Sequence, residues 1–151
     1  MYWRGVQHEL HVARQRRLDH PGNLRPASND SLEKIGDLWR RFHAMGGPAA
    51  IPARRDDAVY CVYCEYETDF TGAFTVLIGC AVDADAEIPD GMKKLAIEAG
   101  KRAVFEPVGE LPKAIFETWA EIWNTPLDRR HQADFDRYGS DGKVTVQVGV
   151  R

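Results

Sequence analysis

Hydrophobic residues alternate with polar or small ones at the end of the chain, and this period of two predicts a β-strand over residues 143–151. The valines at even-numbered positions from 144 to 150 share one face, which we expect to be buried. A turn at 139–142 separates this strand from another over residues 133–138. On that strand Asp134, Asp136 and Tyr138 have the same parity and should point to one side of the sheet.

Two segments carry apolar residues at helical intervals instead. A helix is predicted over residues 31–44, where the glycines and proline at 46–48 end the pattern. Its apolar positions are Leu32, Ile35, Leu38, Trp39 and Phe42. A second helix begins near Pro112, which the first helical turn tolerates, and ends before Pro126. Its apolar stripe contains Ile115, Phe116, Trp119, Ile122 and Trp123.

Residues 59–82 predict a hairpin, because two runs rich in aromatic and β-branched residues surround a polar break at 68–72. By strand parity, one side of the first run carries Tyr60, Val62, Cys64 and Tyr66. The other side carries Cys61, Tyr63, Glu65 and Glu67. The first set contains no charge, so we expect it to face the core and the second set to face an open surface.

Two further strands complete the expected fold, one near residues 9–18 and one over 95–105 with an interruption at Gly100. The order strand, helix, strand, strand then occurs twice, and IGDLWRRF in the first helix is echoed by IFETWAEIW in the second. The sequence therefore predicts an α+β fold. Two βαββ units with pseudo-two-fold symmetry would form one mostly antiparallel sheet, with the two main helices packed on it.

Length and charge narrow the class of protein. A chain of 151 residues fits one domain over residues 1–151, and a net charge of -3 argues against a dedicated nucleic-acid binder. We therefore interpret the arginines at 14, 16, 17 and 25 as a solvated charged edge of the protein and not as phosphate contacts. No apolar run approaches the ~20 residues that span a membrane, and the polar start is unlike a signal peptide, so we expect a cytoplasmic protein with no membrane partner.

Motifs for metal, cofactor and nucleophile chemistry are missing from the sequence. Cys61 and Cys64 form a CxxC inside a predicted strand, where their side chains would point to opposite faces and serve packing. The five histidines have no ligand spacing, and no nucleophile elbow, Walker loop or dinucleotide fingerprint occurs. We expect neither a metal nor a cofactor.

The remaining chemistry is aromatic and acidic. If the polar sides of neighbouring strands join, the open surface would hold Tyr63, Glu65, Asp136 and Tyr138. Small residues would leave room beside them, namely Thr75, Gly79, Thr145 and Gly149. Aromatic faces mixed with carboxylates suit a flat or cationic molecule. The alternative is that the carboxylates are simply solvated and the tyrosines lie at a sheet edge.

Several ordered motifs across residues 24–151 resemble those of a known family. They are LWRRF, YCVYCEYETDFTGAFTVLIGCAV, IPDGM, AGKRAVF, GELPKAIFETWAEIWN and DFDRYG. On these motifs the chain resembles the GyrI-like effector-binding domains, which include the ligand-binding modules of AraC-type and MerR-type transcription regulators. Stand-alone bacterial members, some encoded by integron cassettes, belong to the same group.

The resemblance implies two halves around a central groove that binds small, often cationic and amphipathic molecules. The family's F-E-x-Y strand motif reads Phe135-Asp136-Arg137-Tyr138 here, which makes Asp136 the pocket carboxylate with one methylene less of reach. The helix motif supplies Trp119 and Trp123, and Trp39 is their counterpart in the other half. The expected ligand contacts are thus Asp136, Tyr138, Tyr63, Glu65, Trp39, Trp119 and Trp123.

The expected function is sequestration or sensing of a small organic ligand by a monomer or homodimer. We expect no DNA-binding domain, since no length remains for a helix-turn-helix. One alternative is a hydrolase of reactive small molecules, in which Asp136 or Glu65 would activate water and Tyr63 or Tyr138 would assist the leaving group. Another, by family analogy, is a module that binds a protein partner, as a topoisomerase inhibitor does.

Overall fold

The computed structural model describes residues 2–6, 15–18, 29–51, 54–66, 74–82, 87, 95–97 and 100–151. The helical elements are α1 (Asn29–Ala44), the 3-10 helix η1 (Gly47–Ala50) and α2 (Lys113–Asn124). The strands are β1 (Tyr2–Val6), β2 (Gln15–Leu18), β3 (Val59–Cys64), β4 (Phe74–Gly79), β5 (Gly100–Phe105), β6 (Ala133–Tyr138) and β7 (Val144–Gly149).

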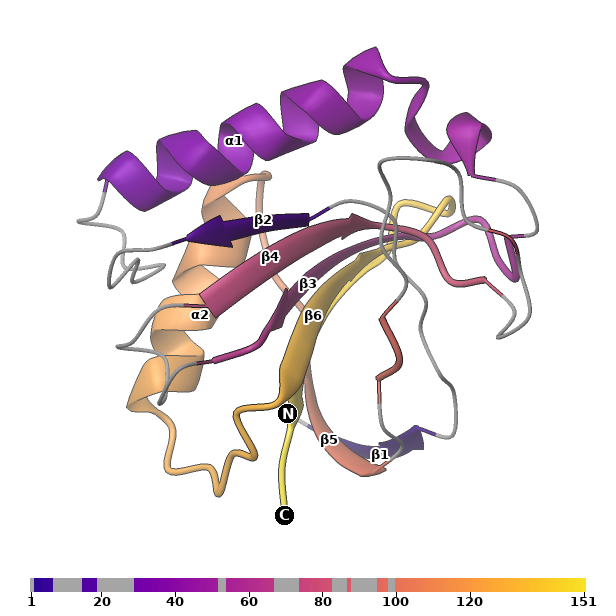
Figure 1. The fold of residues 1–151 in the computed structure, drawn as a ribbon. Coiled ribbons are helices and arrows are strands. Elements are labelled where there is room, and N and C mark those ends of the chain that lie inside the picture. Colours follow the sequence, from indigo (N-terminus) through magenta and orange to yellow (C-terminus); the bar gives the residue numbers. More distant parts are fainter. Residues whose placement is uncertain are drawn as a thin grey trace.

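The described strands form one antiparallel sheet in the order β1-β5-β7-β6-β3-β4-β2 (Figure 1). This order contains two βαββ units, β2-α1-β3-β4 and β5-α2-β6-β7, which meet where β3 pairs with β6. Outward from that seam the two units run β3-β4-β2 and β6-β7-β5. The predicted α+β tandem fold is confirmed.

The observed strands differ from the predictions at two places. β1 was not predicted, and it adds an edge strand beside β5. The strand expected over 95–105 begins only at Gly100. Ile97 packs instead in a core on one face of the sheet, with Leu95 against it. The polar break predicted at 68–72 lies outside the described residues.

Both helices pack on the same face of the sheet (Figure 1). Their buried side chains are Ile35, Leu38 and Phe42 from α1 and Ile115, Trp119 and Ile122 from α2. Val146, Val148 and Val150 meet them from the sheet, so the predicted valine face is confirmed. This core holds both helices on the sheet, with α1 in contact with β4.

The opposite face of the central strands is buried as well. Its core contains Tyr60, Val62, Cys64, Leu77 and Phe135. Cys61 belongs to the helix-side core and Cys64 to this second one, and neither forms a disulfide, as the packing interpretation of the CxxC predicted. Because both faces are covered here, the predicted open sheet surface is wrong.

Candidate functional site

Asp136 lies in the middle of β6 with no exposed surface. It pairs with Cys61 on β3 and Val146 on β7, so its side chain is on the face that the helices cover. The Tyr63 hydroxyl donates to Oδ2 at 2.7 Å, and the Trp119 indole nitrogen donates to Oδ1 at 3.0 Å. Tyr138, two residues along β6, also hydrogen-bonds this carboxyl group.

Burial raises the pKa of Asp136 to about 7, although the hydrogen bonds from Tyr63, Trp119 and Tyr138 act in the opposite direction. Burial also raises the pKa of Tyr63 and of Tyr138, with the charge of Asp136 adding to the effect, so both hydroxyls stay protonated donors. The side chains that contact Asp136 within the described residues are thus neutral. Its negative charge, once formed, is solvated by hydrogen bonds alone.

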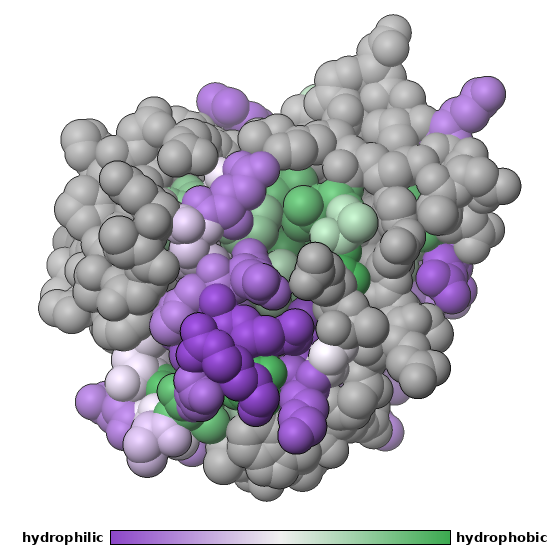
Figure 2. Space-filling model, turned by 60° about the horizontal axis from the view of Figure 1, so that its bottom comes forward, coloured by the Kyte–Doolittle hydropathy of each residue, from purple (hydrophilic) through white to green (hydrophobic). Residues whose placement is uncertain are grey.

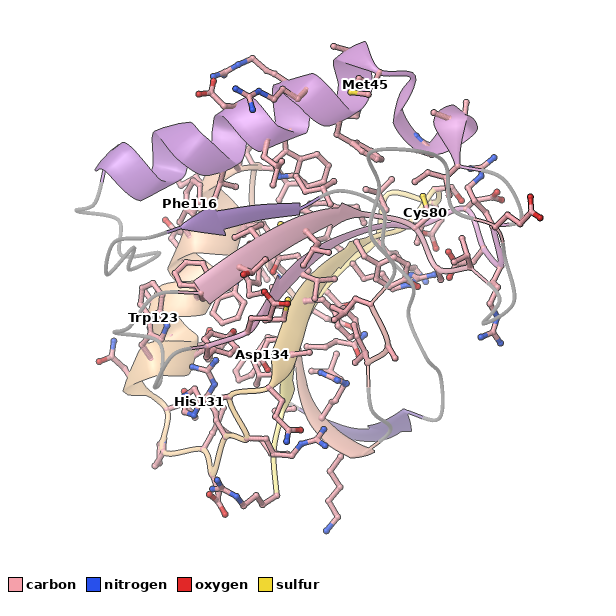
Figure 3. The ribbon with its side chains drawn as sticks, in the orientation of Figure 1. Met45, Cys80, Phe116, Trp123, His131 and Asp134 are labelled. Carbon is pink, nitrogen blue, oxygen red and sulfur yellow. The ribbon has the colours of Figure 1, made fainter. Side chains whose placement is uncertain are left out.

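Asp134 is the second buried carboxylate of β6, and it is fully paired. Arg129 Nη2 lies 2.8 Å from Oδ2, the Tyr66 hydroxyl donates to the same oxygen at 2.7 Å, and the Gly149 amide donates to Oδ1 at 2.7 Å. Figure 3 shows Asp134 on the sheet, with His131 in the segment that leads from α2 into β6. This ion pair ties that segment to the strand ends and is a structural contact.

A cavity of about 530 Å³ lies beside the Asp136 cluster. Its walls come from Trp39 and His43 on α1, from Ile115 on α2, and from Val59 and Tyr138 on the sheet. Leu111, Pro112, Asp57, Gly139 and Ser140 complete the lining. The lining is mostly apolar, as ligand pockets are.

Tyr138 connects the cavity to the buried carboxyl group. Its ring lines the cavity and meets Trp39 edge to face, with centroids 5.2 Å apart, while its hydroxyl hydrogen-bonds Asp136. Trp39 in turn stacks on His43 at 5.9 Å. A molecule in the cavity would therefore contact aromatic rings first, with a carboxyl group one side chain behind them.

The structure brings most of the predicted site residues together. Asp136, Tyr138, Tyr63 and Trp119 form one hydrogen-bonded cluster, and Trp39 joins it through Tyr138. Trp123 packs against Trp119 with ring centroids 6.4 Å apart, on the side of α2 seen in Figure 3. Trp39 thus lines the cavity, Trp119 hydrogen-bonds Asp136 behind it, and Trp123 packs on Trp119.

Glu65 does not join this cluster, and the prediction that it shares a face with Tyr63 is wrong. β3 ends at Cys64, and Glu65 has φ of 51°, which breaks the alternation of a strand. Its carboxylate accepts a hydrogen bond from Thr75, which pairs with Cys64 and so lies on the opposite face. The same break turns Tyr66 onto the helix side, beside Asp134.

The small residues expected around the pocket are also placed elsewhere. Arg137 is the partner of Thr145, and Phe135 is the partner of Gln147, so the non-valine side of β7 lies opposite to Asp136. Gly149 pairs with Arg102 on that same far side. The cavity is lined instead by residues of α1, α2, the start of β3 and the end of β6, together with the segments next to them.

Of the ten residues that line the cavity, only Trp39 and Tyr138 were predicted as site residues, and His43 and Leu111 are among those that were missed. His43 follows Trp39 by four positions, and this spacing on one helix face was a usable signal. Leu111 precedes a cis proline and is 49% exposed, and nothing in the local pattern pointed to it.

Within the described residues, no group of three or more His, Cys, Asp or Glu side chains could hold a metal ion. Neither helix described is long and apolar enough to cross a membrane.

A tandem βαββ sheet that carries a helix-covered aromatic cavity next to a buried carboxyl group has the GyrI-like fold of effector-binding domains. Comparison with protein families identifies the family of this fold to which the chain belongs. Residues 22–149 match the family Cass2, the integron-associated effector binding proteins, and the chain belongs to this family.

Individual relatives agree with this assignment. YobU of Bacillus subtilis (strain 168), named as a candidate transcriptional regulator, is 29% identical, and the match covers 97% of this chain and 94% of YobU. The integron cassette protein VCH_CASS2, from the mobile metagenome of Vibrio cholerae, is 27% identical over 99% of this chain and 95% of its own, with a TM-score of 0.76.

The fold is shared more widely than the sequence. SAV2435, solved with tetraphenylphosphonium bound, superposes with a TM-score of 0.78 at 15% identity, covering 99% of this chain and 93% of its own.

Proposed function

We propose that this protein binds small amphipathic organic cations in the cavity beside Asp136. The observation that carries the proposal is the state of Asp136, a fully buried carboxyl group next to an aromatic cavity, whose described partners are neutral donors. A buried negative charge without a counter-ion favours a cationic ligand, because the ligand supplies the missing charge in a low-dielectric site.

The cavity walls suit the rest of such a molecule. The rings of Trp39 and Tyr138 offer faces and edges for cation–π and stacking contacts, each contributing ~0.5–2 kcal/mol. Ile115 and Val59 offer apolar surface. Tetraphenylphosphonium, the compound bound to SAV2435, combines a positive charge with apolar rings, and its complex with a protein of the same fold supports this ligand class.

The biological role that follows is sequestration of such compounds or sensing of them on behalf of another protein. The family description, effector binding, fits either role. Binding in the micromolar range or weaker is expected for a small preformed pocket of this kind.

Tryptophan fluorescence titration tests the proposal, because Trp39 lines the cavity. Three probes of related shape are compared: tetraphenylphosphonium, its anionic isostere tetraphenylborate, and neutral triphenylphosphine oxide. We expect the cation to bind at least tenfold more tightly than either of the others. In Asp136→Asn this preference should fall by about tenfold, since Asn keeps the side-chain shape and loses the charge.

The matched control is Asp57→Asn, which removes a more exposed carboxylate from the cavity rim. It should change the preference by much less than Asp136→Asn. Equal binding of the three probes, or an unchanged preference in Asp136→Asn, would refute charge selection by the buried carboxyl group.

The raised pKa of Asp136 also keeps the hydrolase alternative open to test, because a general base works best with a pKa near the operating pH. In that reaction Asp136 would accept a proton from water and Tyr138 would donate to the leaving group. Glu65 is on the other face and has no part in it. Reactive aryl esters incubated with the wild type and with Asp136→Asn distinguish the cases: equal background rates favour binding alone.

A further inference from the structure

A second cavity, of about 260 Å³, lies on the face of the sheet that the helices do not cover. Residues from the ends of three strands and the segment before β6 line it: Glu65, Arg102, Arg130, Gln132 and Gly149. Leu95 and Ile97 add apolar surface. At this end of the molecule, strongly hydrophilic side chains gather next to hydrophobic ones (Figure 2).

Arg102 is the buried cation of this cavity, with 1% of its surface exposed. Its Nη1 donates to the Ala133 carbonyl oxygen at 2.9 Å, and its guanidinium lies 4.9 Å from the centre of the Phe135 ring. Its Nε is buried without a hydrogen-bond acceptor. Among the described residues no carboxylate forms an ion pair with Arg102, and the charge of Asp134 acts on it only from a longer distance.

Arg130 brings a second guanidinium to the same cavity. It lies against the backbone of Gly100 and Gly149, where a Cβ atom would approach it to 2.6 Å and 3.0 Å respectively. Its Nη2 contacts the Lys101 carbonyl oxygen at 3.4 Å, and its Nε is buried without an acceptor. The missing side chains of these two glycines thus create the space in which Arg130 lies.

The two arginines act on each other unfavourably. Burial lowers the pKa of Arg102 to about 10, and the positive charge of Arg130 adds to this effect while Asp134 opposes it. Two like charges beside one partly apolar cavity, each with an unused Nε–H donor, form a site that an anion would stabilise.

We propose that this cavity is a second ligand site, selective for a small organic anion whose carboxylate or phosphate group contacts Arg102 and Arg130. The cavity is smaller than the ~300–1,000 Å³ of drug-sized pockets, which limits the ligand to a compact metabolite. Leu95 and Ile97 would pack against its apolar part. Glu65 would exclude a second negative charge and accept a hydrogen bond from a hydroxyl or ammonium group of the ligand.

The proposed anion site differs from the cation cavity in the sign of its charge and in its position in the fold. Asp136 faces the helices, whereas Arg102 packs on Phe135, a residue of the opposite core. The two ligands would therefore bind without overlap, and the anion site does not depend on the function proposed above.

The test uses sodium benzoate, sodium 4-hydroxybenzoate and sodium phosphate, each exchanged for sodium chloride at constant ionic strength. Nitrogen–proton NMR spectra follow the Arg Nε–H signals while thermal unfolding follows Tm. At tenfold over Kd, a bound anion should raise Tm by roughly 3–5 °C and shift the Arg102 and Arg130 signals saturably. The Nε–H signal of Arg137, which donates to the Tyr60 hydroxyl at 3.2 Å, is the internal control and should stay in place.

Two variants decide whether the arginines carry the effect. Arg130→Gln removes the less buried charge, and Arg102→Met replaces the buried cation by an apolar chain, so it should be at least as stable as wild type without anion. Both should abolish the Tm increase, whereas Asp136→Asn should keep it. Absence of a saturable shift with all three anions, or an undiminished Tm increase in Arg130→Gln, would overturn the proposal.

Discussion

Asp134 and Asp136 are two residues apart on β6, point to the same face and are both fully buried, but their surroundings differ. Asp134 has a buried arginine as its partner, a tyrosine hydroxyl and a backbone amide. Asp136 has only neutral donors among its described contacts, and an aromatic cavity adjoins them.

The difference shows how one strand can carry a carboxylate that stabilises the fold and, under the proposed function, another that binds a ligand. An ion pair inside the protein neutralises Asp134, so a ligand would gain little from approaching it. Three hydrogen bonds solvate Asp136 without neutralising it, so its ionised carboxylate can still form an ion pair with a cationic ligand. Variants and pH changes that separate these two behaviours are the sharpest tests.

The largest effect is expected from Asp134→Asn. The variant leaves Arg129 buried without its counter-ion, because Arg129 is only 7% exposed, and turns an amide donor toward the Tyr66 hydroxyl. We expect the free energy of unfolding to fall by about 5 kcal/mol in urea denaturation at pH 7. Asp136→Asn is the matched comparison, and an equal loss in the two variants would contradict the distinction between the residues.

The second effect is on stability as a function of pH. The pKa of Asp136 is about 7 in the folded protein and near 3.8 when unfolded, so the folded state holds the extra proton between these values. Stability should therefore fall as pH rises from about 4 to 7, by on the order of 4 kcal/mol from this group, and then level off. Urea denaturation of wild type and Asp136→Asn across this range isolates the contribution as their difference. A constant difference would contradict the raised pKa.

The third effect concerns ligand affinity. Only ionised Asp136 balances a cation, so the affinity for tetraphenylphosphonium should rise by up to about tenfold per pH unit below 7 and level off above it. Calorimetry should also detect proton release on binding at pH 6. In Asp136→Asn both effects should vanish, and a pH-independent affinity in wild type would sink the assignment of Asp136 as the counter-charge.

The smallest effect is expected from Tyr138→Phe, which keeps the ring in the cavity and removes the hydroxyl that hydrogen-bonds Asp136. Loss of this bond should raise the pKa of Asp136 further and weaken cation binding at pH 7 by about 1 kcal/mol, roughly fivefold. Val59→Ala, a trim of the cavity wall, should weaken cationic and neutral probes equally. If Tyr138→Phe also weakens both equally, the hydroxyl has no electrostatic role.

Much of the fold could be predicted from the pattern along the chain. The bounds of β6 were predicted as observed, and α1 begins two residues before the predicted start. α1 has a strong helical periodicity because it lays one apolar face on the main core, whereas β6 is delimited by the turn at 139–142 that follows it. β1 was missed because its sequence, YWRGV, has no clean alternation.

The candidate site could be predicted only where strand geometry is regular. Parity placed Asp136 and Tyr138 together correctly because β6 is uninterrupted from Ala133 to Tyr138. Parity gave the wrong face for Glu65, because its positive φ reverses the direction of the side chain. The residue type at this position gave no indication of that turn. Parity also leaves the register between strands undetermined, which is why the side of β7 that faces Asp136 was assigned wrongly.

The seam between the two βαββ units has a consequence for how a ligand would be oriented. Cys61 on β3 lies directly across from Asp136 on β6, so at this pair of the seam a thiol faces a carboxyl group. At this pair of residues only the β6 side can carry a carboxylate charge. Under the proposed function, an elongated cation would place its charged end toward Asp136, because the opposite strand offers only a thiol at this point.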